Sequence, residues 1–187
     1  MQNSTLENQA SAVELVTEIL GAISQDLEAM LEHPVSFRKV STELVHQRAQ
    51  GEGQVHISFR FSLEWQGQGK MGCLLLPLPD ASAMAGYLLA LEEPATREAR
   101  RIEEPETTMK ESMLLLGQIL STSLGRVAKR RLPAGLRVDF AGCQGVRAGI
   151  RPALEYREGA PLCVARAESQ VGGFAPFEAL LMLPLFE

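Results

Sequence analysis

An unbroken alternation of apolar and polar residues over positions 55–64 constrains the fold more than any other feature of this sequence. The segment reads VHISFRFSLE, and one side of an extended chain would carry Val55, Ile57, Phe59, Phe61 and Leu63. This pattern predicts a strand with one face in the core and the other exposed to solvent. Residues 35–45 and 70–76 are also strand-like, and glycine- and glutamine-rich turns separate the three segments, which predicts an antiparallel meander.

Helical periodicity flanks these strands. Apolar residues step by threes and fours over residues 13–31, which predicts an amphipathic helix that ends before Pro34. Asp80 stands where a carboxylate can cap a second helix. The longest periodic segment, residues 106–131, predicts a third helix, and the charged, proline-containing residues 92–106 before it are expected to form an exposed connector.

Four more strand-like segments follow the third helix: LRVDFAG, IRPALEYR, PLCVARAE and FEALLMLPLF. The order of helices and strands predicts an α+β fold with helices packed on one face of an antiparallel sheet. The helical segments 19–23 and 115–119 read ILGAI and LLGQI, which suggests that the two halves of the chain are related by duplication. Residues 1–11 are polar and are expected to be flexible, and residues 12–187 are expected to form one domain.

The composition excludes several classes of function. The net charge is -5, from 18 Lys+Arg against 23 Asp+Glu, which argues against a nucleic-acid-binding surface. No apolar run could span a membrane and no signal sequence is recognisable, so we expect a cytoplasmic protein that does not bind membranes. The three cysteines have no paired spacing and are expected to be free thiols, and the histidines lack metal-ligand spacing. We therefore expect no metal and no cofactor.

The phase of the third helix gives the most informative surface expectation. At about 100° per residue, Gln118 falls opposite the apolar stripe of this helix, with Leu114 and Leu115 on either side of it. Two leucines on an outward face are unusual for a solvated helix. Either they contact a partner, a second copy or another element of the chain, or they are incidental surface residues.

Three segments resemble the CheC/CheX-like chemotaxis phosphatase superfamily, and CheX in particular. They are MLLLGQILSTSLGRVAK with the LRVDF strand after it, the block GKMGCLLLPLPDASAMAGYLLALEE, and the opening VTEILGAISQDLEAMLEHPVSF. Together they cover about residues 12–142. The resemblance implies an antiparallel sheet with helices on one face and two pseudo-duplicated halves.

The resemblance also implies a chemistry. In this family a helix carries a Glu and, three residues later, an Asn, which orients a water toward the aspartyl phosphate of a CheY-type receiver while the Glu pairs with a receiver lysine. With Gly117 in register, the Glu falls on Leu115 and the Asn on Gln118, so the pair is replaced. In the first helix, the same register gives Ile19 and Ala22 at these places, and a shift by one residue gives Glu18 and Gly21. Neither helix keeps a complete pair.

Two functions remain open at this point. The first is binding to a receiver domain or another signalling partner through Leu114, Leu115, Gln118 and Thr122, because leucine at position 115 can neither form an ion pair nor transfer a proton. The second is an aspartyl-phosphate phosphatase in which Gln118 orients the water and Glu111 replaces the missing acid. A homodimer formed through an exposed sheet edge is compatible with either function.

Overall fold

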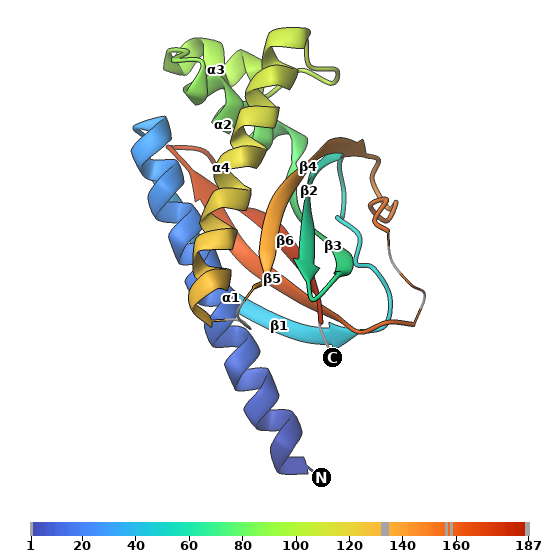
Figure 1. Cartoon of the computed structure of the whole chain (residues 1–187). Helices are drawn as coiled ribbons and strands as arrows, with labels where there is room; N and C mark the ends of the chain where they lie inside the picture. Colours follow the sequence, from blue (N-terminus) through green and yellow to red (C-terminus); the bar gives the residue numbers. More distant parts are fainter. Residues whose placement is uncertain (1, 132–134, 156, 158, 186–187) are drawn as a thin grey trace.

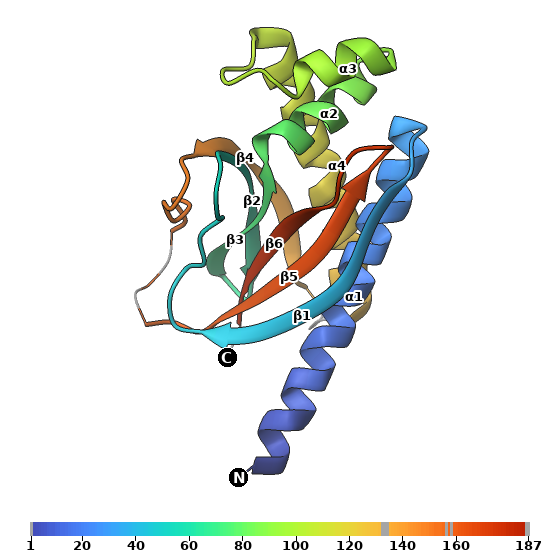
Figure 2. The same cartoon turned by 180° about the vertical axis from the view of Figure 1, so that it is seen from behind.

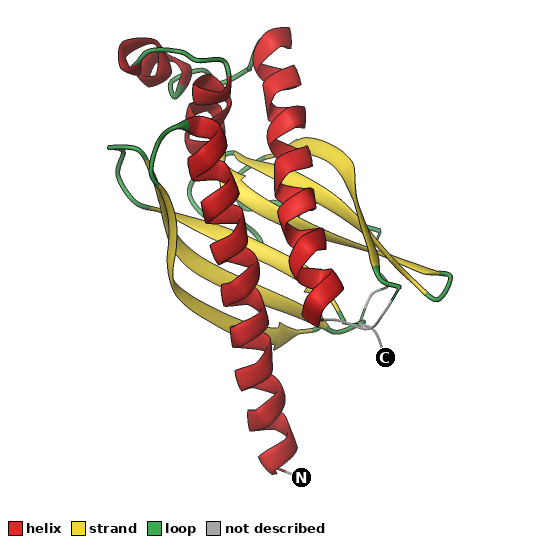
Figure 3. Cartoon of the chain, turned by 60° about the vertical axis from the view of Figure 1, so that its left-hand side comes forward, coloured by secondary structure: helices red, strands yellow, loops and turns green. Residues whose placement is uncertain are grey.

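The computed structural model describes residues 2–131, 135–155, 157 and 159–185. These residues form four helices and one six-stranded sheet (Figure 1). Two long helices, α1 (Gln2–Leu31) and α4 (Thr107–Arg131), lie antiparallel to each other on one face of the sheet (Figure 3). The shorter helices α2 (Leu78–Leu88) and α3 (Glu93–Ala99) lie at one end of it. The expected α+β class, with helices on one face, is confirmed.

The strands pair in the order β1-β5-β6-β3-β2-β4, and every neighbouring pair is antiparallel. Their bounds are β1 (Val35–Val45), β2 (His56–Trp65), β3 (Gln68–Pro77), β4 (Arg137–Val146), β5 (Leu162–Val171) and β6 (Phe177–Pro184). Of the expected three-stranded meander, the pairing of β2 with β3 is confirmed and the pairing of β1 with β2 is wrong. β2 and β3 form a hairpin whose two turn residues, Gln66 and Gly67, have φ of 50° and 76°, the left-handed values of the turn that suits twisted strands. β1 pairs instead with β5, because a longer segment separates β1 from β2 and imposes no pairing.

The sheet order shows the relation between the two halves. Exchanging β1 with β4, β2 with β5 and β3 with β6 gives the same strand order read from the opposite edge of the sheet. A pseudo-two-fold axis therefore passes between β6 and β3. The same exchange relates α1 to α4. The expected pseudo-duplication is therefore confirmed, and each half contributes its first strand to the edge of the other half's hairpin.

The duplicated helices correspond with a shift of one residue from the match of sequence letters. Burial repeats over α1 at Val16, Ile19, Leu20 and Ile23, and over α4 at Met113, Leu116, Gly117 and Leu120. Gly21 is exposed and therefore corresponds to Gln118, whereas Gly117 is buried. Burial therefore supports the register in which Glu18 corresponds to Leu115. The match of sequence letters would instead make the fully buried Ile19 correspond to the exposed Leu115.

The main core lies between the helix pair and the sheet, and it contains Phe59 and Phe61 of β2. A smaller apolar cluster lies on the opposite face of the sheet, the face that is turned toward the viewer in Figure 2. Its members are Cys73, Leu75, Leu162, Val164, Leu180 and Met182. Partly buried residues of the two long connections, 46–55 and 147–161, pack on this cluster. The Arg48 guanidinium joins the connections by donating to the Pro152 carbonyl at 2.7 Å.

This cover corrects the expectation of a half-exposed β2 for the first half of the strand only, since Arg60 and Ser62 are partly exposed and Glu64 is exposed. His56 and Ser58, on its polar side, are only 4% and 0% exposed. The alternating pattern identifies the strand and its core-facing side, but it cannot show that a distant connection covers the other side.

Three further expectations differ from the structure. Residues 150–155 form no strand. The expected connector 92–106 is mostly exposed, but it contains the short helix α3, whose Thr96 and Ala99 are buried. Asp80 does not cap α2, which begins after Pro77 without a side-chain cap. The Asp80 carboxylate is buried and pairs with the Arg100 guanidinium at 2.5 Å. An ion-pair partner twenty residues away thus replaces the local capping role.

Candidate partner-binding face on helix α4

Helix α4 is held at a defined rotation by a close contact with β4. A Cβ atom placed on Gly117 would lie 2.2 Å from two ring carbons of Phe140, so only glycine allows the ring to approach the helix backbone this closely. Met113, Leu116 and Leu120 face the core on the same side of the helix. The residues on the opposite side of α4 are consequently directed to solvent.

All five predicted site residues lie on this solvent-facing side. Leu114 and Leu115 are 42% and 45% exposed, and Glu111, Gln118 and Thr122 are also exposed. At about 100° per residue the five positions fall within roughly 100° of arc. The expected helical phase is confirmed, and the structure brings the five residues together on what we call the α4 face.

Backbone contacts restrict the chemistry of the α4 face. The hydroxyl groups of Thr122 and Ser121 both donate to the Gln118 carbonyl oxygen, at 2.8 Å and 2.9 Å. The Thr122 hydroxyl proton is therefore engaged within the helix. The polar groups that remain for a ligand are the Gln118 carboxamide and the Glu111 carboxylate, and the two leucines provide the apolar surface.

The spacing of these polar groups differs from the spacing that the phosphatase chemistry requires. Residues three apart on a helix are separated by about 4.5 Å along its axis, whereas the seven residues from Glu111 to Gln118 correspond to about 10.5 Å. Glu111 therefore lies two turns away from Gln118. Leucine occupies the position where the resemblance implies the acid.

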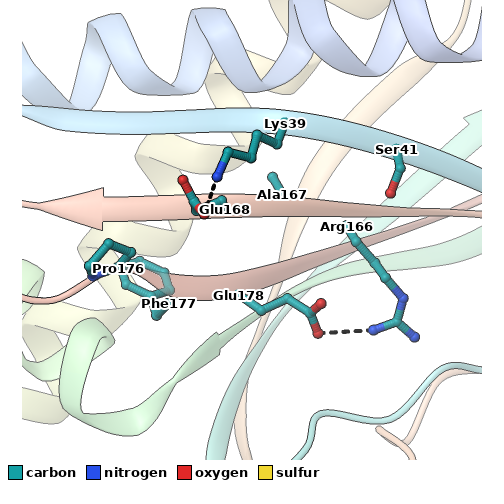
Figure 4. A pocket seen from close by; sticks show the side chains of 8 residues that line it. All are labelled: Lys39, Ser41, Arg166, Ala167, Glu168, Pro176, Phe177 and Glu178. Carbon is teal, nitrogen blue, oxygen red and sulfur yellow. Dashed lines mark hydrogen bonds and ion pairs between the residues drawn. The ribbon is translucent and has the colours of Figure 1, made fainter.

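Polar cavities elsewhere in the described part of the chain were not predicted from the sequence, and two of them gather charged residues. One is an open pocket of about 420 Å³ on the sheet face opposite the helices (Figure 4). Its charges form cross-strand ion pairs, Lys39 with Glu168 at 2.8 Å and Arg166 with Glu178 at 2.9 Å. Such pairs stabilise and solubilise a sheet surface, and they leave little uncompensated charge for a ligand.

A second polar cavity, of about 400 Å³, lies where α2 begins and is lined by His56, Asp80, Arg100 and Glu178 among others. Burial lowers the pKa of His56, whose Nδ1 lies 2.9 Å from the Gln54 carbonyl. Burial also raises the pKa of Asp80, although the Arg100 guanidinium opposes this shift. The only signal for this cluster in the sequence was a histidine on the polar side of β2, which by itself predicts an exposed residue.

Several expected absences can be compared with the part of the chain that the structure describes. The three cysteines are free thiols, as expected. No group of three or more potential metal ligands is found among the described residues. None of the described helices is both long and apolar enough to cross a membrane.

The six-stranded sheet with exchanged halves, covered on one face by an antiparallel helix pair, is a CheC/CheX-like α+β fold. No family model matches the chain, and no curated protein matches it in sequence. Solved structures do match.

FliY from Thermotoga maritima has a TM-score of 0.69 at 11% identity, covering 95% of this chain and 90% of its own. The FliM middle domain from H. pylori has a TM-score of 0.66 at 11% identity, with coverages of 95% and 92%. CheX from Desulfovibrio desulfuricans has a TM-score of 0.57 at 12% identity, with coverages of 91% and 97%. At such low identity the likeness establishes the fold, and the expected resemblance in fold is confirmed.

Proposed function

We propose that this chain is a CheX/CheC-like signalling protein that binds a receiver domain of CheY type, or another signalling partner, through the α4 face. The observation that carries the proposal is Leu115, which is 45% exposed at the position where the resemblance implies the catalytic acid. A half-exposed leucine contributes about 1 kcal/mol to binding when a partner covers it. It contributes nothing to proton transfer or to an ion pair with a receiver lysine.

The comparisons support binding as a use of this fold. The matched FliM structures from H. pylori include one in complex with FliG and one in complex with SpeE. Those complexes are of FliM and identify no partner for this chain. They support the view that the fold serves protein assembly as well as catalysis.

The proposal is tested by measuring the affinity of the purified chain for each CheY-type receiver of the native cell, phosphorylated and unphosphorylated. We expect Leu115→Lys to weaken binding by at least about ten-fold, because a lysine cannot replace the apolar contact. Leu89→Lys is the matched control, since Leu89 is also an exposed leucine, at 36%, but lies at the end of α2. Unchanged receiver binding by Leu115→Lys, or equal loss in both variants, would contradict the proposal.

The second candidate function is a phosphatase with an altered site. The observation that favours it is the exposure of Gln118 and Glu111 on the same side of α4. A carboxamide can orient a water, but Gln is one methylene longer than Asn and Glu111 lies two turns away, so positioning of the water would be displaced. Robust phosphate release that Gln118→Ala abolishes would establish this second function in place of the first.

A further inference from the structure

An apolar groove lies beside the N-terminal half of α4, next to the α4 face. Its volume is about 370 Å³, toward the lower end of the range of roughly 300–1,000 Å³ for ligand pockets. Ile57, Leu78 and Met113 contribute to its wall and are at least nine-tenths buried. Leu114 and Val55 also line it and are 42% and 39% exposed, so the groove continues into the exposed apolar surface of α4.

The backbone keeps this groove open. Gly145 of β4 is paired with Ile57 in the sheet, and a Cβ atom at position 145 would meet no other atom within 4 Å. The Leu78 N–H donates to the Val55 carbonyl at 2.9 Å, which fixes Val55 to the start of α2. The groove is therefore formed before a partner binds, which reduces the entropic cost of association.

The rim of the groove is acidic. Glu103 and Glu104 line it together with Lys110, and Glu106 and Glu111 lie in the same stretch of sequence. Four carboxylates against one ammonium give this stretch an excess of negative charge. None of the four glutamates has an ion-pair partner among the residues that the structure describes. An acidic rim favours a partner that carries complementary basic residues.

We infer that the groove receives an apolar side chain of the partner protein, and that lysine or arginine residues flank this side chain in the partner's sequence. The inference rests on the proposed function, because Leu114 belongs to both the groove and the α4 face. An apolar anchor buried in a preformed pocket supplies most of the affinity in such interfaces, and the surrounding charges select the partner.

The probes are three short peptides. The first carries a leucine with two lysines on each side, the second carries the same leucine with two glutamates on each side, and the third carries a serine in place of the leucine of the first peptide. Binding is followed by the backbone amide spectrum of the isotope-labelled full chain. We expect the lysine-flanked leucine peptide alone to shift the amides of Met113, Leu114 and Gly145. Equal shifts with all three peptides, or no shifts with any, would overturn the inference.

Two variants test the groove itself. Gly145→Val fills it and should weaken binding of the lysine-flanked peptide by at least about ten-fold, while Gly69→Val is the matched control, because a Cβ at this second strand glycine also meets nothing within 4 Å. Glu104→Lys should weaken the lysine-flanked peptide and strengthen the glutamate-flanked one. Peptide binding that neither variant alters would overturn the inference.

The same variants separate this inference from the proposed function. Receiver binding that is lost in Leu115→Lys but unchanged in Gly145→Val would leave the α4 face as the binding site and overturn the groove. Conversely, peptide binding that depends on Gly145 in a chain that binds no receiver would support the groove and reject receivers as the partner.

Discussion

Substitution of Gly117 by alanine tests the contact that sets the rotation of α4 and so exposes Leu115. The new Cβ would lie 2.2 Å from Cε2 and Cζ of Phe140, whereas packed carbon atoms are roughly 3.5–4.0 Å apart. The ring or the helix must move by roughly 1.3 Å or more, and overpacking of this kind costs about 1–3 kcal/mol. Alanine offsets about 1 kcal/mol of this cost through its helix propensity. We expect Gly117→Ala to lower the free energy of unfolding by about 1 kcal/mol.

Gly21→Ala is the matched control, because Gly21 is an exposed glycine of α1 whose added Cβ would meet no atom within 4 Å. It should raise the free energy of unfolding by about 1 kcal/mol. Both values come from urea unfolding followed by circular dichroism. In a Phe140→Ala background the ring is absent, and Gly117→Ala should become stabilising. A Gly117→Ala variant as stable as Gly21→Ala, or one equally destabilised with and without the Phe140 ring, would refute the role of this contact.

Three further predictions concern activity, pH and thiol reactivity. The natural chain should not accelerate phosphate release from a phosphorylated CheY-type receiver, because losing about 2–3 kcal/mol of transition-state stabilisation lowers the rate by roughly 30- to 150-fold. Leu115→Glu combined with Gln118→Asn should restore measurable release. Robust release by the natural chain would contradict this prediction. Burial lowers the pKa of His56 in the folded state, so the unfolded chain binds a proton first and stability should fall as the pH drops below about 6.5. His56→Gln should flatten that dependence in urea unfolding at a series of pH values, and an unchanged slope would argue against it. Cys143 is partly exposed, whereas burial raises the pKa of Cys73 to about 12, so in native thiol titration Cys143 should react first and Cys73 only after unfolding.

Local periodicity explains why most elements could be predicted. The alternation of β2 and the three-and-four spacing of α4 depend only on which side of an element is buried, and both proved correct. The same spacing predicted the outward position of Leu114 and Leu115. Helix α1 begins at Gln2, whereas the periodicity predicted a helix only from residue 13, because the residues before this position carry no apolar stripe. The strand expected over residues 150–157 was wrong in its described part, residues 150–155 and 157, because periodicity over a short segment does not guarantee a pairing partner.

Pairing and burial between distant segments could not be predicted. The partner of β1 is β5, more than a hundred residues later, and nothing in either segment names the other. His56 is buried because a connection covers the polar side of β2, and Asp80 is buried because Arg100 of the following segment pairs with it. The groove beside Leu114 exists because Gly145 of β4, which has no side chain, pairs with Ile57 of the neighbouring strand β2.

The helices and most strands, the α+β class, and the outward face of α4 with leucine where the resemblance implies an acid could therefore all be predicted from the order of residues. Each of these follows from the side-chain order within one element. The exchange of edge strands between the halves, the choice of the one-residue shift between α1 and α4, and the acidic groove became visible only in the folded chain. These depend on which elements meet in space, and the free energy of such contacts is not encoded in any single stretch of the chain.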